Sequence, residues 1–246
     1  MLLAADLPAP FGAAFTTRCG GVSTGGFAEL DLSPRVGDDP AAVAENRRRL
    51  ARSLGPDGGQ VELVSPVQVH GVRVVGAAEY RGAAPDGCDG LVVHRDLDRG
   101  LAALLLFADC VPVILAGEVD VAVAHAGWRG LLGGVIQEAA RRMTAPPGLA
   151  YVGPSIGPCC YAVGADVAEQ FSRRYGARTV VDDGPGGAPR VDLWAAVEAA
   201  LLEVEVPPAR VVNPRLCTSC NADVFYSHRV SGGVAGRHGA VAWVAA

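Results

Sequence analysis

Short apolar segments follow one another closely in the middle of the chain, and they constrain the fold more than any other feature. They lie at 91–93, 101–107, 111–115 and 119–124 and consist mainly of Val, Leu and Ala. Each is far shorter than the roughly 20 residues that a membrane-spanning helix needs. Short Val- and Leu-rich runs of this kind are typical of buried strands. The sequence therefore predicts a core built on β-sheets.

Further strands are expected on either side of these runs. The stretch 61–69 is predicted to be a strand that ends at His70 and pairs with 72–75 as a hairpin through Gly71. The remaining expected strands are 13–17, 151–156, 211–212 and 240–244.

Helices are predicted between the strands. Asp39 and Pro40 suit the start of a helix over 41–54, because a carboxylate caps the first turn and proline fits its first position. The other expected helices are 129–143, stopped by Pro146-Pro147, and 166–175 and 192–204, each with a leading Asp as its cap.

The order of these elements predicts an α+β fold with α/β-type layers, in which mixed sheets are sandwiched by helices. The 246 residues fit one large domain or two small ones. They contain no internal repeat and no dividing linker, and the Gly- and Pro-rich stretch 183–189 is expected to be a loop. We therefore expect a single domain over 1–246.

Charge and cysteine content limit the partners and the compartment. The net charge is -5 and no basic stretch stands out, which argues against nucleic acid as a partner. The first ten residues lack the features of a signal peptide, so a cytoplasmic location is the default expectation. Seven cysteines, an odd number, suit thiols, metal ligands or nucleophiles in a reducing compartment. No amphipathic stretch indicates an interface, so a monomer is expected.

Three candidate metal ligands each lie at the end of an apolar strand. They are His70, Cys110 and His125. Two His and one Cys make a suitable zinc set with a fourth position left open, and such a site can lower the pKa of a bound water. The spacing alone also allows two polar strand-end histidines and a buried cysteine. Cys110 could instead be a nucleophile with either histidine as its base, and Asp109 is a candidate to orient a ligand or move a proton.

A possible anion site follows His125. Gly127-Trp128-Arg129-Gly130 lies where a strand is expected to become a helix. The free N–H groups of a helix start, with Arg129 beside them, suit phosphate or carboxylate. The same residues are equally consistent with an ordinary strand–helix turn that carries an exposed arginine.

Other candidate residues carry weaker signals. Cys217 and Cys220 form a C-x-x-C, but a structural zinc would need two more ligands, so structural or incidental thiols are expected. His94 and His238 are expected at the surface. His228 is expected either to line the pocket or to pack near the C-terminus.

Several motifs together resemble the laccase-domain family of the YfiH type, also described as multicopper polyphenol oxidases and as purine nucleoside phosphorylases. The resemblance runs in order over nearly the whole chain. The matching blocks are Thr16-Thr17-Arg18 with Gly20-Gly21-Val22-Ser23, Val36-Gly37-Asp38-Asp39 with Glu45-Asn46-Arg47, Gln68-Val69-His70-Gly71, Ala108-Asp109-Cys110-Val111-Pro112-Val113, His125-Ala126-Gly127-Trp128-Arg129-Gly130, Gly153-Pro154-Ser155-Ile156-Gly157 and Cys217-Thr218 with Phe225, Ser227, His228, Arg229, Gly236 and Arg237.

This resemblance implies an α/β fold of sheets sandwiched by helices and a zinc site on His70, Cys110 and His125. It implies phosphorolysis of purine nucleosides such as adenosine, inosine and methylthioadenosine, together with adenosine deamination. The older family name implies copper and phenol oxidation. The chain departs from the family at Asp31, where asparagine is usual.

The residue inventory favours zinc over multicopper chemistry. A trinuclear copper cluster with a separate copper site needs more histidines than the five present here. The nucleobase deaminase signature is also absent, so no proton shuttle can be assigned by motif.

For phosphorolysis, we expect Arg129, Arg47 and Arg18 to clamp phosphate, with Asn46 and His228 also binding substrate and with Asp109 and Cys110 in catalytic roles. Two rival classes remain: an amidase or other cysteine hydrolase that works through Cys110, and a non-enzymatic partner protein that keeps the pocket as a relic.

Overall fold

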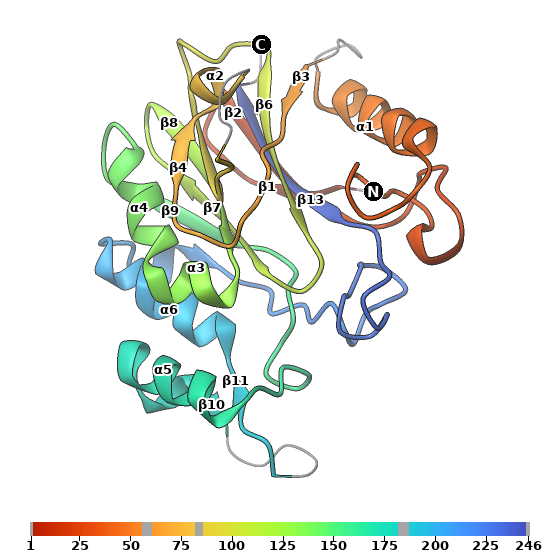
Figure 1. The fold of residues 1–246 in the computed structure, drawn as a ribbon. Helices are drawn as coiled ribbons and strands as arrows, with labels where there is room; N and C mark the ends of the chain where they lie inside the picture. Colours follow the sequence, from red (N-terminus) through yellow and green to blue (C-terminus); the bar gives the residue numbers. More distant parts are fainter. Residues whose placement is uncertain (1, 56–60, 82–85, 182–186, 245–246) are drawn as a thin grey trace.

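The computed structural model describes residues 2–55, 61–81, 86–181 and 187–244, and two β-sheets form its centre (Figure 1). The larger is a six-stranded mixed sheet whose antiparallel centre comes from the apolar runs. Its strands, in spatial order, are β12 (Val211–Val212), β9 (Leu149–Val152), β7 (Val111–Ala116), β8 (Asp120–Ala126), β5 (Gly90–His94) and β4 (Val74–Gly76).

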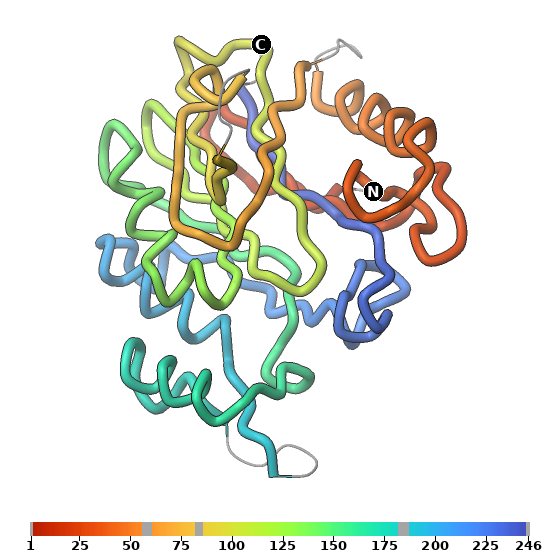
Figure 2. Tube along the Cα trace, in the orientation of Figure 1, coloured from red at the N-terminus to blue at the C-terminus, as the bar shows by residue number. Residues whose placement is uncertain are grey.

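The second sheet has five strands and joins the two ends of the described chain. Its spatial order is β1 (Leu2–Ala5), β2 (Phe11–Thr16), β13 (His238–Val244), β6 (Leu101–Phe107) and β3 (Glu62–Val64). The C-terminal strand β13, blue in Figure 2, is antiparallel to both of its neighbours, β2 and β6. A small hairpin of β10 (Val180–Val181) and β11 (Arg190–Val191) lies apart from these sheets.

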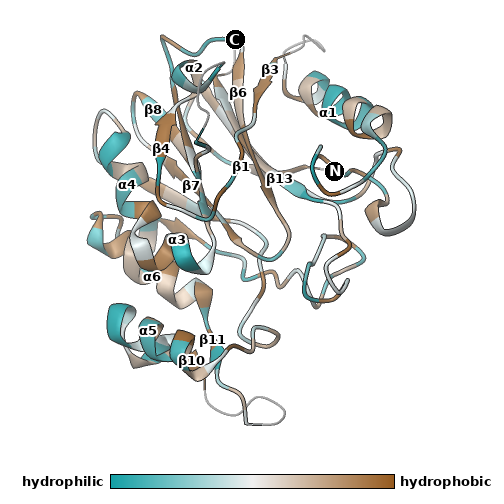
Figure 3. Cartoon of the chain, viewed as in Figure 1, coloured by the Kyte–Doolittle hydropathy of each residue, from teal (hydrophilic) through white to brown (hydrophobic). Residues whose placement is uncertain are grey.

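The two sheets face one another across a shared apolar core. Strand β6 shows how the alternation of side chains divides its residues: Leu105 and Phe107 point into the core between the sheets, whereas Leu104 and Leu106 point to the opposite face. Figure 3 shows both sheets as mostly hydrophobic along their length. Because both faces of the central strands are buried, their sequences are continuous apolar runs rather than alternating ones.

Helices cover the two outer faces. The helix α1 (Pro40–Leu54) covers the five-stranded sheet through Leu50 and Leu54. The outer face of the six-stranded sheet is covered by α3 (Trp128–Gly133), α4 (Val135–Arg142) and α6 (Leu193–Glu203), and α5 (Ala165–Tyr175) packs against α3 and α6. A short helix, α2 (Ala77–Tyr80), follows β4, and single 3-10 turns lie at Gly25–Phe27, Ala177–Thr179 and Pro208–Arg210. The predicted α+β class, with sheets sandwiched by helices, is confirmed.

Within the part of the chain that the structure describes, no helix combines the length and the apolarity that crossing a membrane requires.

One predicted hairpin is wrong. Only Glu62–Val64 of the stretch 61–69 is a strand, and it pairs with β6, whereas β4 pairs with β5 in the other sheet. The backbone nitrogen of Pro66 cannot donate to a ladder. Val67 and Val69 are 38% and 54% exposed, so their apolar character does not mark a buried strand.

Three other predicted elements differ in detail. The helix expected over 129–143 is two helices, because Gly134 takes a left-handed conformation between α3 and α4. The strand expected over 151–156 ends at Val152. Asp192 caps α6 through its side chain as predicted, but Gly164 rather than Asp166 stands at the cap position of α5. The expected loop 183–189 lies partly outside the described residues.

His238 is fully buried, although a surface position was expected. It lies in β13, with its ring stacked on those of Tyr226 and Phe107. Burial lowers the pKa of His238 to about 3, so this side chain is a neutral part of the core at physiological pH.

Candidate metal centre

His70, Cys110 and His125 converge, although they come from three separate segments. Their ligand atoms all lie within 4.8 Å of one another. His70 lies in the loop before β4, Cys110 in the connection between β6 and β7, and His125 in β8. His125 is buried, Cys110 is half-buried and His70 is exposed, so the cluster opens to solvent on the His70 side.

Local backbone geometry brings the three side chains together. His70 and Asp109 have positive φ angles of 59° and 89°, which turn the chain sharply at the end of each segment. Gly127 has no side chain, and this gives room for the side chains of His70 and Cys110. A Cβ there would lie 3.0 Å from Cδ2 of His70 and 3.3 Å from Sγ of Cys110. A side chain at this position would therefore push the ligands apart.

Asp89 is a buried carboxylate that sequence reasoning missed. Its Oδ1 lies 2.8 Å from Nδ1 of His125. It also accepts hydrogen bonds from the backbone N–H groups of Val69, His70 and Gly71. Asp89 thus holds one ligand directly and fixes the loop that carries another. The available signal was an acidic residue immediately before the buried run that begins at Gly90.

The buried charges of the cluster stabilise one another. Burial alone would raise the pKa of the Cys110 thiol, but the charge and hydrogen bonds of His125 and His70 outweigh it and lower the pKa to about 6. Burial would also lower the pKa of His125, but Cys110 and Asp89 outweigh that effect and raise it to about 9. Without a metal, the pair is therefore a thiolate beside an imidazolium.

The donor set fits zinc. Two imidazoles and one thiolate are usual zinc ligands, and three protein ligands leave a position for substrate. Metal-binding histidines commonly give their second ring nitrogen to a carboxylate, as His125 does to Asp89. The three side chains can hold one ion, whereas a trinuclear copper cluster would need more histidines.

A cavity of about 460 Å³ adjoins the cluster and carries mostly positive charge. Among the described residues, its lining includes three arginines and one carboxylate, Asp109, together with three histidines; these are Arg35, Arg229, Arg237, His70, His125 and His228. Apolar side chains, including Val36, Leu106 and Ile156, make up much of the remaining lining. A cavity with several guanidinium groups and one carboxylate is suited to an anionic ligand that also has an apolar part.

Asp109 lines the cavity, but its side chain is already engaged. Its Oδ1 accepts from Oγ1 of Thr218 at 2.7 Å, and its Oδ2 accepts from the backbone N–H of Arg229 at 2.8 Å. The guanidinium of Arg229 lies over the ring of Tyr161. Burial raises the pKa of the Tyr161 hydroxyl to about 12, with Arg229 and Arg129 acting in the opposite direction. Asp109 thus joins the segments that carry Thr218 and Arg229 to the turn that carries Cys110.

Three of the residues expected to bind substrate are not part of the lining of this cavity. Among the described residues, the cavity lining does not include Arg18, Asn46 or Arg47. Arg18 donates to the carbonyls of Ala28 and Ala222, and Arg47 donates to the carbonyl of Leu32. The structure thus engages both guanidinium groups in joining segments of the chain.

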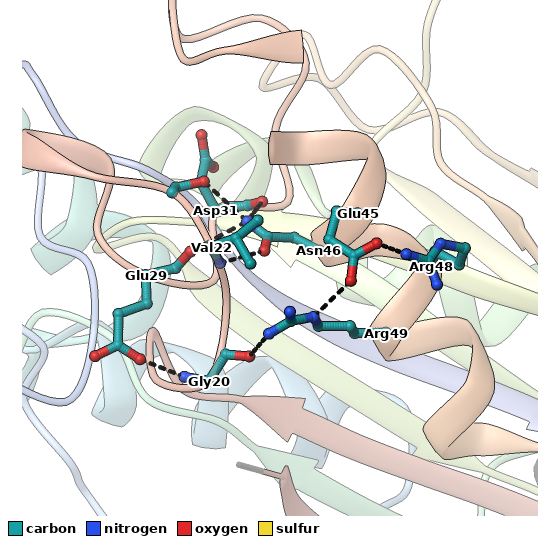
Figure 4. A network of polar contacts seen from close by, with 9 residues as sticks. Gly20, Val22, Glu29, Asp31, Glu45, Asn46, Arg48 and Arg49 are labelled. Atoms are coloured by element: carbon teal, nitrogen blue, oxygen red, sulfur yellow. Dashed lines mark hydrogen bonds and ion pairs between the residues drawn. The ribbon is translucent and has the colours of Figure 1, made fainter. Parts of the chain in front are cut away.

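Asn46 lies in a polar network between α1 and the loop before it (Figure 4). Its amide donates to the carbonyls of Glu29 and Asp31 and to Oγ of Ser23, and its Oδ1 accepts from the N–H of Val22. These contacts engage both the NH2 group and the oxygen of the amide. Ion pairs of Glu45 with Arg48 and Arg49 surround the network.

Arg129 is exposed at the start of the six-residue α3, with its guanidinium 4.4 Å from the centre of the Trp128 ring. It does not appear among the described residues that line the cavity, although His228 does. Sequence reasoning assigned no role to the three arginines that do line it, although Arg229 and Arg237 lie in the C-terminal block of the family resemblance.

The fold and this site define a class: α+β proteins of two facing sheets with a His–Cys–His cluster at a positively charged cavity. The sequence pattern of the family described as multi-copper polyphenol oxidoreductase laccase matches residues 12–245. The chain belongs to this family.

Named relatives and solved structures are similar over most of the chain. The purine nucleoside phosphorylase YlmD of Geobacillus stearothermophilus is 35% identical, covering 92% of this chain and 87% of the relative. A purine nucleoside phosphorylase of Streptomyces coelicolor is 39% identical, covering 87% and 88%. The crystal structure of a Neisseria meningitidis protein is similar with a TM-score of 0.89 and 35% identity, over 100% of this chain and 99% of that one.

Proposed function

We propose that this protein is a zinc-dependent purine nucleoside phosphorylase. The observation that carries the proposal is the position of a two-His, one-Cys ligand set at a cavity lined by three arginines. The names of the relatives supply the substrates, a purine nucleoside and phosphate.

In phosphorolysis, a phosphate oxygen forms a bond to C1′ of the ribose as the bond from C1′ to the purine nitrogen breaks. The electron pair leaves with the purine, which takes up a proton. Arg35, Arg229 and Arg237, which line the cavity, would bind the phosphate and offset its charge as it approaches C1′. The apolar lining gives the nucleoside a surface from which water is excluded.

His70, Cys110 and His125 would hold the metal, and Asp89 would keep His125 oriented with its Nε2 directed to the ion. Bound zinc supplies a Lewis acid that polarises an oxygen of the substrate.

The direct test is an assay of the zinc-loaded protein with adenosine and phosphate that resolves adenine from inosine. Adenine with ribose 1-phosphate supports phosphorolysis. The adenosine deamination implied by the family resemblance predicts inosine without phosphate consumption. A fully zinc-loaded protein that turns over no purine nucleoside would contradict the proposal.

Two variants locate the phosphate site. Arg229→Met should raise the KM for phosphate about tenfold to a hundredfold, because a charge-assisted contact is worth roughly 1.5–3 kcal/mol. Arg129→Met, outside the cavity, tests the sequence-based assignment under the same conditions. If only Arg129→Met raises this KM, phosphate binds at the α3 turn instead.

A second candidate is a cysteine hydrolase, and one observation favours it. Cys110, His125 and Asp89 are arranged as nucleophile, base and orienting carboxylate. Chelation separates the two proposals, because a thiolate nucleophile keeps its activity without metal whereas the zinc-dependent phosphorylase loses it.

A further inference from the structure

Four cysteines that take no part in the proposed active site gather in one place. Their Sγ atoms all lie within 4.8 Å of one another. The Sγ of Cys220 is 3.5 Å from both Sγ of Cys159 and Sγ of Cys160. The four-cysteine cluster consists of Cys159, Cys160, Cys217 and Cys220.

Two turns bring these residues together from distant parts of the sequence. Cys159 and Cys160 lie in the turn that follows β9, where the N–H of Cys160 donates to the carbonyl of Gly157. Cys217 and Cys220 lie in the turn that follows β12, and Cys217 forms a parallel bridge with Ser155. The C-x-x-C thus gains the two partners that its own sequence neighbourhood lacks.

We propose that the four-cysteine cluster is a second metal site, which binds one structural zinc ion. A zinc ion with four thiolates has Zn–S bonds of about 2.3 Å, which places tetrahedral sulfurs about 3.8 Å apart. The sulfur separations in the cluster, 3.5 Å to at most 4.8 Å, bracket that value. A disulfide needs sulfurs about 2.05 Å apart.

The surroundings fit a thiolate site as well. The backbone N–H of Gly157 donates to Sγ of Cys217 at 3.3 Å, a contact that stabilises a sulfur carrying negative charge. Cys159 and Cys220 are exposed, so an ion can reach the cluster from solvent. Four protein ligands leave no open position, which is the arrangement of structural rather than catalytic zinc.

The site would fix one wall of the active-site cavity. Between the two turns lies Asp109, whose carbonyl accepts from the N–H of Ile156 and whose carboxylate accepts from Thr218. Ile156 lines the cavity, and Cys110 follows Asp109 directly. An ion that ties the two turns together would therefore hold the backbone on both sides of the metal-ligand turn. Binding would release the thiol protons, because zinc binds the thiolate form.

Metal content tests the proposal. In a Cys110→Ala protein, which removes a ligand of the other site, we expect one zinc per chain by elemental analysis and four sulfur ligands at about 2.3 Å by X-ray absorption. Adding Cys159→Ser and Cys220→Ser should remove that zinc, whereas Cys19→Ser should leave it in place. If the proposed active site did not bind zinc but the four-cysteine cluster did, the wild-type protein would contain one zinc instead of two. A metal-free Cys110→Ala protein, or one that holds iron, would overturn the proposal.

A second measurement uses the wild-type protein, so its outcome does not depend on whether a variant folds. Cys159 and Cys220 are exposed and should be alkylated quickly once a strong chelator has removed the metal. In the zinc-loaded protein we expect their alkylation to be at least about tenfold slower, as peptide mass spectrometry would show. Equal rates in both states, or a disulfide among these cysteines in anaerobically purified protein, would overturn the proposal.

Discussion

Asp89 determines the state of the candidate ligand His125. The carboxylate lies at Nδ1, so the neutral ring, which is the form that binds a metal, would carry its proton on Nδ1 and offer Nε2 to an ion. It also receives three backbone N–H groups from the loop that carries His70. One buried side chain thus organises two of the three ligands, so its chemistry should affect metal binding more than that of any exposed carboxylate.

We predict that Asp89→Asn lowers the affinity for zinc about tenfold to a hundredfold. An amide cannot accept hydrogen bonds at both of its polar atoms, so its NH2 group would face either Nδ1 of His125 or the backbone N–H groups. Competition with a chromophoric chelator measures the affinity, and circular dichroism checks that the variant is folded. Asp86→Asn, an exposed change three residues earlier, is the matched control. Equal affinity in the two variants would show that Asp89 does not orient His125.

Asp31 should make stability depend on pH. Its Oδ1 accepts from the N–H groups of Ser33 and Arg237, but its Oδ2 has no hydrogen-bond partner among the described residues. Burial raises the pKa of Asp31 from 3.8 to about 6. The folded state therefore holds the proton more tightly than the unfolded state. The free energy of unfolding that protonated Asp31 contributes is fully present below pH 3.8, and it is lost as the pH rises through about 6.

We accordingly predict that Asp31→Asn, which cannot ionise, gains stability relative to the wild type between pH 4 and pH 7.5. The gain should reach up to about 3 kcal/mol, since one pKa unit corresponds to about 1.4 kcal/mol. Urea unfolding of both proteins at the two pH values gives the difference, in which the other titrating groups cancel. A difference that does not change with pH would contradict this account.

The ligand trio was predictable residue by residue because each member ends an apolar run inside a recognisable motif. Asp89 was not, and the same holds for the four clustered cysteines. The role of Asp89 depends on which strands are neighbours, because the position of β5 beside β8 sets Asp89 next to His125. The four-cysteine cluster was hidden for the same reason, because β9 and β12 are adjacent in the sheet but far apart in the sequence.

At the scale of elements, hydrophobic runs located the strands well when both faces of the strand are buried. β5, β6, β7 and β8 all lie where such runs occur. Apolar content wrongly predicted a strand at 65–69, where the valines lie in an exposed loop. The shape of this loop is set by hydrogen bonds from its backbone to Asp89 and by Pro66. Apolar content alone does not reveal a segment that is held by polar contacts with the rest of the chain.

The break between α3 and α4 rests on one residue, and it allows a prediction. Gly134 has a φ of 92°, which side-chain-bearing residues rarely adopt. Gly134→Ala should lower the free energy of unfolding by about 1–2 kcal/mol. Gly148→Ala, where a Cβ would have nothing within 4 Å, should change it by less than about 0.5 kcal/mol. Denaturant unfolding of the pair measures both values, and equal stabilities would show that the helix break tolerates a Cβ.

At the scale of the whole molecule, β13 joins sheet segments from opposite parts of the chain. It lies between β2 and β6, and Ala240, Val241 and Ala242 are fully buried within it. The two sheets share one apolar core. Helix α1 packs on the outer face of the five-stranded sheet, and α4 and α6 pack on the outer face of the six-stranded sheet. From this shared core we expect the described part of the chain to unfold as one cooperative unit, and the single domain expected over 1–246 stays a prediction.

We therefore predict that a chain ending at Arg237, without β13, does not form the native fold. Removing this strand would leave β2 and β6 with unpaired backbone groups on facing edges and would expose the core between the sheets. A chain beginning at Leu7 loses only the edge strand β1, so it should fold with lower stability. Thermal unfolding followed by circular dichroism and by tryptophan fluorescence should give one coincident transition for the full chain. Separate transitions, or cooperative unfolding of the chain that ends at Arg237, would mean that the two sheets fold as independent units.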